Sequence, residues 1–208
     1  MTGLRGRWLP LSVLVGAVTA LVASLAWVAG TGLGPGGPAG MMGAVSGEGP
    51  VTSMADADRA AARFGDRWDL QVGEVMEFSN GYYAELLAGD GSLATEVLID
   101  PGNGLVHLEF GPAMMWNTAY GMMPARGAAG PATVGGEAAV RIADRWLSER
   151  RAGLHAGEPD RLPGYFTLHV LRDGQLVGML SVNATTGAVW YHSWHGRFIR
   201  MQEHPGNG

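Results

Sequence analysis

Hydrophobic and polar residues alternate along short stretches in the last two thirds of the chain, and turn residues separate these stretches. Such alternation predicts half-buried β-strands. Asp-Gly turns at 90–91 and 173–174 lie between alternating runs, which is typical of β-hairpins because glycine accepts a positive φ. The predicted strands cover 71–78, 82–88, 92–99 and 105–110, and then 165–171, 175–182 and 188–194.

Two further stretches have helical rather than alternating spacing. Residues 55–68 and 137–148 predict one amphipathic helix ahead of each group of strands, and Thr52 or Ser53 can cap the first. We expect Trp68 and Trp146 to dock these helices onto their sheets. The pattern therefore predicts an α+β fold in which one helix packs on an antiparallel sheet of three or four strands, twice over.

The two groups of strands match each other as an internal repeat. Adding 83 to a number in 81–110 gives its counterpart in 164–193, without a gap. In the helices the matching residues differ by 78, so the second copy is expected to carry five extra residues within a loop-like stretch, 150–164. The matched pairs include Gly81 and Gly164, Tyr82 and Tyr165, Leu93 and Leu176, Asp100 and Asn183, and Gly104 and Gly187. A repeat of this kind indicates two copies of one small folding unit.

Each copy contains a hydrophobic strand that leads into the pattern Asp/Asn-x-x-x-Gly-x-Val. The motif reads LIDPGNGLV at 98–106 and SVNATTGAV at 181–189. With the preceding helix and hairpins, it resembles the PepSY domain, a family of secreted-peptidase propeptides and membrane-associated relatives. The resemblance covers about 55–110 and 136–195, and in the second copy Asn183 replaces the usual acid. The resemblance implies a non-catalytic domain that binds and modulates a peptidase.

Residues 8–30 carry no charge and are long enough, as a helix, to span a bilayer. Arg5 and Arg7 precede this segment without any acid, so the positive-inside rule predicts a cytoplasmic N-terminus and an exterior C-terminal part. The expected protein is thus anchored in membrane lipid by one helix. The alternative is a cleaved secretory signal, which also places the repeats outside the cytoplasm.

These observations predict seven regions along the chain. They are a cytoplasmic tip at 1–7, the transmembrane helix at 8–30, a Gly/Pro-rich linker at 31–50, the first repeat at 51–112, a Met-rich linker at 113–134, the second repeat at 135–199 and a tail at 200–208.

Composition narrows the chemistry further. The chain has no cysteine, which excludes disulfides and thiolate chemistry. Its net charge is −5, and every acidic residue lies after residue 31, so the exterior part is a poor surface for nucleic acid. The sequence has no Gly-x-Ser-x-Gly elbow, phosphate loop or His-Glu-x-x-His motif. We therefore expect no catalysis and no obligatory cofactor.

Two groups of residues are candidate metal ligands. Met114, Met115, Met122 and Met123 surround Tyr120 in the linker, and thioethers suit Cu(I). The competing interpretation is that these methionines fill irregular space between two domains.

The second group is His192 and His195. The two imidazoles could share a metal only if the chain bends after Ser193. No acid near them in the sequence completes a site, although Glu203 and His204 follow in the tail. The alternative is that both histidines are structural.

The sequence thus favours a membrane-anchored, extracytoplasmic binding protein. Its expected partner is a peptidase or another envelope protein, held at a sheet edge by β-augmentation. The alternative is an envelope protein that handles copper through these methionines and histidines.

Overall fold

The computed structural model describes residues 45, 47–122 and 131–203, and within them two antiparallel sheets with their helices belong to the same compact unit. The first repeat begins with α2 (Met54–Gly65) and the short 3-10 helix η2 (Asp66–Trp68). Its strands are β1 (Gln71–Phe78), β2 (Gly81–Leu87), β3 (Leu93–Ile99) and β4 (Val106–Leu108). Ser53 caps α2, because its side chain accepts a hydrogen bond from the backbone N–H of Asp56.

A short helix, α3 (Pro112–Met115), follows the first repeat. The second repeat then comprises α5 (Gly136–Arg150), β5 (His155–Leu162), β6 (Tyr165–Arg172), β7 (Gln175–Asn183) and β8 (Val189–Tyr191). The last strand that the structure describes is β9 (Phe198–Gln202). The predicted helices and strands are thereby confirmed to within a few residues at most ends. The exception is the last strand, which stops at Tyr191 instead of continuing to residue 194.

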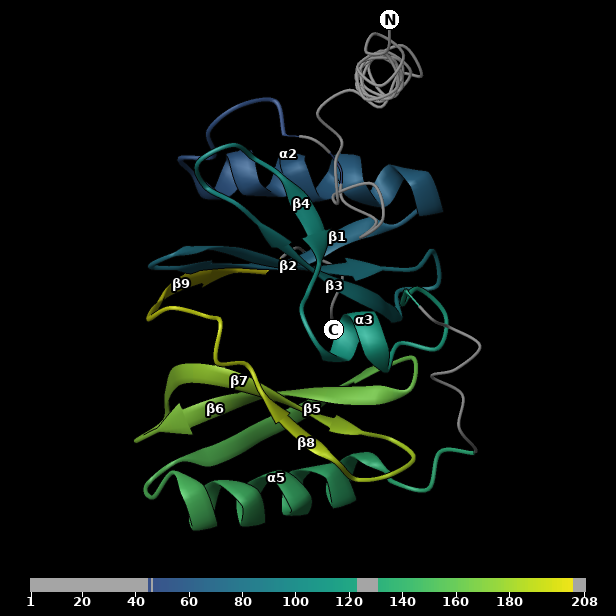
Figure 1. Ribbon diagram of the computed structural model, residues 1–208, viewed down its shortest axis with the longest axis vertical. Helices are drawn as coiled ribbons and strands as arrows, with labels where there is room; N and C mark the ends of the chain where they lie inside the picture. Colours follow the sequence, from purple (N-terminus) through teal and green to yellow (C-terminus); the bar gives the residue numbers. More distant parts are fainter. Residues whose placement is uncertain (1–44, 46, 123–130, 204–208) are drawn as a thin grey trace, which may run out of the picture. The chain divides into compact units, whose positions relative to one another are not determined.

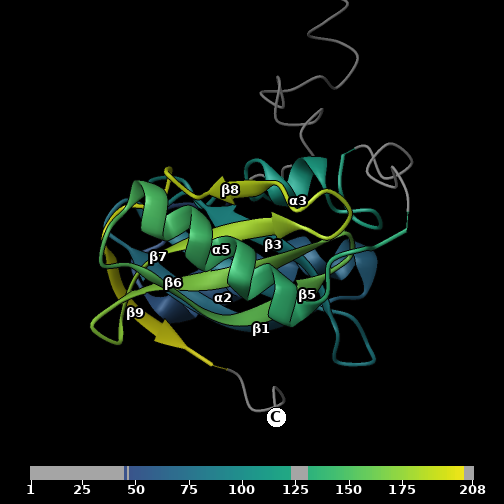
Figure 2. The ribbon, with the colours of Figure 1, turned by 90° about the horizontal axis from the view of Figure 1, so that it is seen from below.

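Four layers result, because each helix covers one face of its own sheet and the remaining faces meet (Figures 1 and 2). Ala57, Ala61 and Phe64 of α2 pack on the first sheet, while Ala143 and Leu147 of α5 pack on the second. Between the sheets lies a third cluster that draws on both repeats, formed by Met76, Phe78, Tyr83 and Met179 with Leu98, Leu176 and Phe198.

Two strands differ from the sequence-based expectation. The stretch 150–164 is not a loop, since β5 occupies most of it and pairs with β6. Strand β9 crosses the expected boundary between repeat and tail at 199. It leaves the second repeat and pairs with β1, so the order of the first sheet is β4-β3-β2-β1-β9. The second sheet has the order β5-β6-β7-β8.

The single offset of 83 holds for only part of the repeat. Ile99 and Val182 both face their helix and differ by 83, but their neighbours across the hairpin are Tyr82 and Phe166, which differ by 84. A one-residue slip turns a strand's side chains to the opposite face. The Gly81–Gly164 and Tyr82–Tyr165 matches are therefore structurally wrong, and the extra residue is absorbed in the turn after β2.

The helices also match differently from the prediction. Their N-caps are Ser53 and Gly135, and Ala57 and Ala61 correspond in burial to Ala139 and Ala143. The offset is thus 82, not 78, and Trp68 does not correspond to Trp146. Of the two tryptophans, Trp146 packs on the second core and Trp68 is 36% exposed.

Candidate functional site

A buried polar layer lies between the two sheets, and Glu96 of β3 stands at its centre. The hydroxyl of Tyr83 donates to its Oε1 at 2.7 Å, and the hydroxyl of Tyr165, from the second repeat, donates to its Oε2 at 2.6 Å. All three side chains are fully buried. Burial and the nearby Glu109 carboxylate raise the pKa of Glu96 to about 7, against the lowering effect of His192 and the two hydroxyls. Burial, followed by the charge of Glu96, raises the pKa of both tyrosines well above the usual value.

Four side chains meet next to this centre. Glu109 follows β4, and His192, Trp194 and His195 follow β8. Oε1 of Glu109 lies 2.6 Å from Nε2 of His195 and 3.1 Å from Nδ1 of His192. The indole nitrogen of Trp194 also donates to Oε1, at 3.3 Å. Burial raises the pKa of Glu109, but the charges and close contacts of His192 and His195 outweigh it and lower this pKa to about 2.

Two hydroxyl groups of the second repeat orient the imidazole of His192 from the side opposite Glu109. Its Nε2 lies 2.9 Å from the hydroxyl of Ser181, which in turn lies 3.0 Å from the hydroxyl of Thr167. The ring stacks on Trp194 with centroids 4.8 Å apart. A hydroxyl chain of this kind fixes both the direction of an imidazole and which of its nitrogens faces Glu109.

The chain turns immediately after His192. The backbone N–H of His192 bonds to the carbonyl of Met179, continuing the β7 pairing, and residues 193 and 194 form a turn. This turn is the bend that two convergent imidazoles require. The acid that joins them comes from the other repeat and was missed by sequence reasoning.

One signal in the sequence pointed to Glu109. Its residue number differs from that of His192 by 83, the offset between the two repeats that holds for β3, β4 and the residues after them. The two backbones are also equivalent, since Glu109 N–H bonds to Glu96 just as His192 N–H bonds to Met179. Corresponding positions of the two copies thus meet across the interface, one as an acid and the other as a base.

A second polar group lies between the sheets at Glu85, where β1, β2, β5 and β6 meet. Burial raises the pKa of Glu85 well above its usual value, and the charges of Glu74, Asp160 and Glu96 raise it further. Burial lowers the pKa of His169, but its contact with Glu74, at 3.6 Å, and the charge of Asp160 raise it overall.

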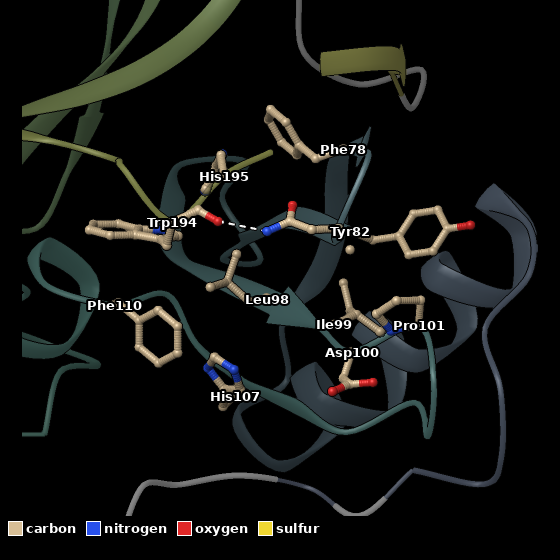
Figure 3. A pocket seen from close by; sticks show the side chains of 12 residues that line it. Phe78, Tyr82, Leu98, Ile99, Asp100, Pro101, His107, Phe110, Trp194 and His195 are labelled. Carbon is tan, nitrogen blue, oxygen red and sulfur yellow. Dashed lines mark hydrogen bonds between the residues drawn. The ribbon is translucent and has the colours of Figure 1, made fainter. Parts of the chain in front are cut away.

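A cavity of about 250 Å³ opens beside the Glu109 cluster (Figure 3). Apolar and aromatic side chains form part of its wall, and Asn80, Asp100, His107 and His195 add polar groups. Figure 3 shows Trp194 and His195 from the second repeat closing one side, held by a hydrogen bond from the Asn80 amide to the carbonyl of Trp194. The wall comprises Phe78, Asn80, Gly81, Tyr82, Leu98, Ile99, Asp100, Pro101, His107, Phe110, Trp194 and His195.

The predicted methionine site is split between different environments. Met114 packs into the core of the first repeat, whereas Met115 and Met122 are exposed. Met123 lies outside the described residues. Of the candidate ligands, the structure brings His192 and His195 together, and both contact Glu109.

The predicted transmembrane segment, 8–30, also lies outside the described residues. Among the helices that the structure does describe, none has the length and apolar character needed to cross a bilayer.

Comparison with known proteins adds little to these observations. No family model matches the chain, and no curated protein matches it. Among solved structures, the C-terminal domain of Bacillus megaterium YpeB is similar at 9% sequence identity, with a TM-score of 0.30 over 69% of this chain and 67% of that one. A similarity at this level assigns neither a fold family nor a function.

Proposed function

We propose that this chain is a non-catalytic, membrane-anchored extracytoplasmic protein whose two PepSY-like repeats bind and modulate a peptidase or another envelope protein. The apolar segment 8–30 and the repeated motif at 98–106 and 181–189 support the location and the class of domain. The aromatic cavity built from both repeats is the observation that carries the binding role.

The size of the cavity favours a protein segment over a free small molecule. Sites for drug-sized ligands usually measure about 300–1,000 Å³, so a cavity of about 250 Å³ suits one or two side chains of a longer ligand. At its rim, Phe110 is 39% exposed and stands edge-on to Trp194, with ring centroids 6.0 Å apart. Exposed aromatic anchors of this kind dominate binding energy at protein interfaces.

The neighbouring sheet edge can hold the backbone of such a segment. His107 of β4 lines the cavity, and β4 is an edge strand of the first sheet. Val45 already pairs with Val106 on the outer side of β4, by backbone hydrogen bonds of 2.8 and 3.1 Å. An extended partner segment would take the place of Val45 on this edge while its side chains enter the cavity.

Photocrosslinking in the native cell tests this proposal. A photoreactive phenylalanine analogue replaces Phe110 in one strain and Trp68 in a control strain. Trp68 is a matched control because it is similarly exposed, at 36%, but does not line the cavity.

The proposal predicts that position 110 captures an envelope protein that position 68 does not, and that the crosslinked peptide of this partner is an extended segment. A peptidase as the captured protein supports the finer form of the proposal. Equal labelling from both positions, or no adduct at 110, refutes binding at the cavity.

A further inference from the structure

We propose that Glu109, His192 and His195 bind one divalent transition-metal ion, with Zn²⁺ as the matching ion, at the junction of the two repeats. Each residue offers one ligand atom: a carboxylate oxygen, Nδ1 of His192 and Nε2 of His195. These three atoms lie within 4.8 Å of one another. The proposal does not depend on a partner at the cavity.

The distances are close to those of a metal centre. Zn²⁺ binds imidazole nitrogen and carboxylate oxygen at about 2.0–2.2 Å, which places tetrahedral ligand atoms about 3.3 Å apart. The present separations from Oε1 of Glu109 are 2.6 Å to His195 and 3.1 Å to His192. An opening of less than about 1 Å therefore admits the ion.

Three buried atoms at this point have no hydrogen-bond partner. They are Oε2 of Glu109, Nδ1 of His195 and Nδ1 of His192, which lies 3.1 Å from Oε1 of Glu109 without forming a hydrogen bond. Buried polar atoms are nearly always paired, because an unpaired one costs about 1–3 kcal/mol. A cation between Glu109 and His192 would pair the first and the last of these atoms, Oε2 of Glu109 and Nδ1 of His192.

The surroundings of His192 match those of a metal-binding histidine. Such a residue usually donates its second ring N–H to a fixed acceptor, which leaves the other nitrogen free for the metal. Here Nε2 faces the hydroxyl of Ser181 and Nδ1 faces Glu109. The chain from His192 through Ser181 to Thr167 is thus the orienting support that a metal site requires.

Charge favours a cation as well. The carboxylate of Glu109 is fully buried, and in the part of the chain that the structure describes its ion pairs are with His192 and His195 rather than with an arginine. A buried carboxylate needs a compensating positive charge. A divalent ion supplies that charge and ties the end of β4 to the end of β8.

The donor set distinguishes this site from a methionine site for Cu(I). Two imidazoles and a carboxylate suit Zn²⁺, Co²⁺ or Cu²⁺, whereas thioethers suit Cu(I). His195 lines the cavity of Figure 3 as well as the cluster, so the cavity lies next to the proposed ion. A water or a partner group entering from the cavity can take the fourth coordination position.

Metal titration of the full-length chain in detergent tests the proposal. After chelator treatment, Zn²⁺ is followed by calorimetry and Co²⁺ by its visible absorption. We expect one equivalent of Zn²⁺ bound with Kd below about 1 μM, a tetrahedral Co²⁺ spectrum that Zn²⁺ abolishes, and a Tm that rises with Zn²⁺ concentration.

Variants assign the binding to these residues. His195→Ala is expected to weaken Zn²⁺ binding by at least about 100-fold, and Ser181→Ala, which keeps all three ligands, by about 10–100-fold. His107→Ala is the matched control, because His107 lines the same cavity but lies outside the cluster. The Zn²⁺ affinity of this variant should equal that of the native chain. Circular dichroism establishes that each variant is folded.

Two results would overturn the site. One is the absence of binding tighter than about 10 μM in the folded native protein. The other is an unchanged affinity in folded His195→Ala, which would place the metal elsewhere in the chain.

Discussion

At the scale of single residues, the motif shared by the two repeats acts as a turn. Oδ1 of Asp100 accepts hydrogen bonds from the backbone of residues 102 and 103, and Oδ1 of Asn183 accepts them from residues 185 and 186. Both turns end in a glycine at positive φ, Gly104 at 71° and Gly187 at 69°. The amide of asparagine accepts these bonds as well as a carboxylate does, so Asn183 preserves the turn.

Replacing these glycines should have unequal effects. Gly187→Ala should lower the free energy of unfolding by about 1 kcal/mol, the cost of a left-handed backbone for alanine. Gly104→Ala should lower it by at least about 1 kcal/mol more, because its Cβ would lie 2.6 Å from the carbonyl oxygen of Gly49. Urea unfolding of both variants measures the difference, and equal losses would contradict the close approach at Gly104.

Glu85 should make stability depend on pH. Its pKa is raised in the folded state, so the folded chain keeps a proton that the unfolded chain has lost. Stability is therefore unaffected below the ordinary carboxyl pKa of about 4.3 and falls as the pH rises from there toward the folded pKa. The charged or titratable groups around Glu85 are Glu74, Tyr83, Glu96, Asp160 and His169.

Glu85→Gln should remove this loss. The variant should be more stable than the native chain by at least about 1 kcal/mol at pH 8, with a smaller difference at pH 5. Urea unfolding at the two pH values measures the effect, and Glu158→Gln, at an exposed position, is the control. Parallel pH profiles for Glu85→Gln and the native chain would show that Glu85 is not a raised-pKa carboxyl.

At the scale of elements, alternation and turn residues predicted the central hairpins, because both depend on local chemistry. Strand β5 was missed because Gly157, Pro159 and several charged residues interrupt its alternation. The correct offset of 84 was missed because residue identities at Gly81 and Tyr82 outweighed the pattern of faces. Strand β9 is short and carries Arg200, and its pairing with β1 depends on contacts more than 100 residues apart, which no local pattern reveals.

Strand β9 should protect the first sheet. It covers the edge of β1, where Arg200 Nε bonds to Glu77 at 2.7 Å and Phe198 packs on Phe78. A chain ending at residue 197 should lose about 2 kcal/mol of stability and self-associate through the exposed β1 edge. Urea unfolding and light scattering measure the two effects.

A chain ending at Glu203 is the matched control for this truncation, since it retains β9, and it should behave as the native chain does. If the chain that ends at residue 197 is as stable and as monomeric as this control, β9 is not part of the sheet.

At the scale of the whole molecule, two copies of one unit have become complementary. The inner face of the first sheet carries Glu74, Glu85 and Glu96, and Glu109 follows its last strand, whereas the second repeat supplies hydroxyls and histidines. Buried charges add little net stability but penalise any other arrangement. Of the candidate site, His192 and His195 could be predicted from the sequence. For Glu109 the sequence offers only its offset of 83 from His192, because the packing of one repeat on the other is what brings it to the two histidines.

A double-mutant cycle on Glu96→Met and Tyr165→Phe tests this packing most directly. The two side chains share a 2.6 Å hydrogen bond from one repeat to the other, and methionine is the residue at the equivalent position, Met179. If the two sheets pack face to face, the free energies of unfolding should show a coupling of about 1 kcal/mol or more. Additivity to within about 0.3 kcal/mol would mean that the two residues do not meet, and the face-to-face arrangement would be wrong.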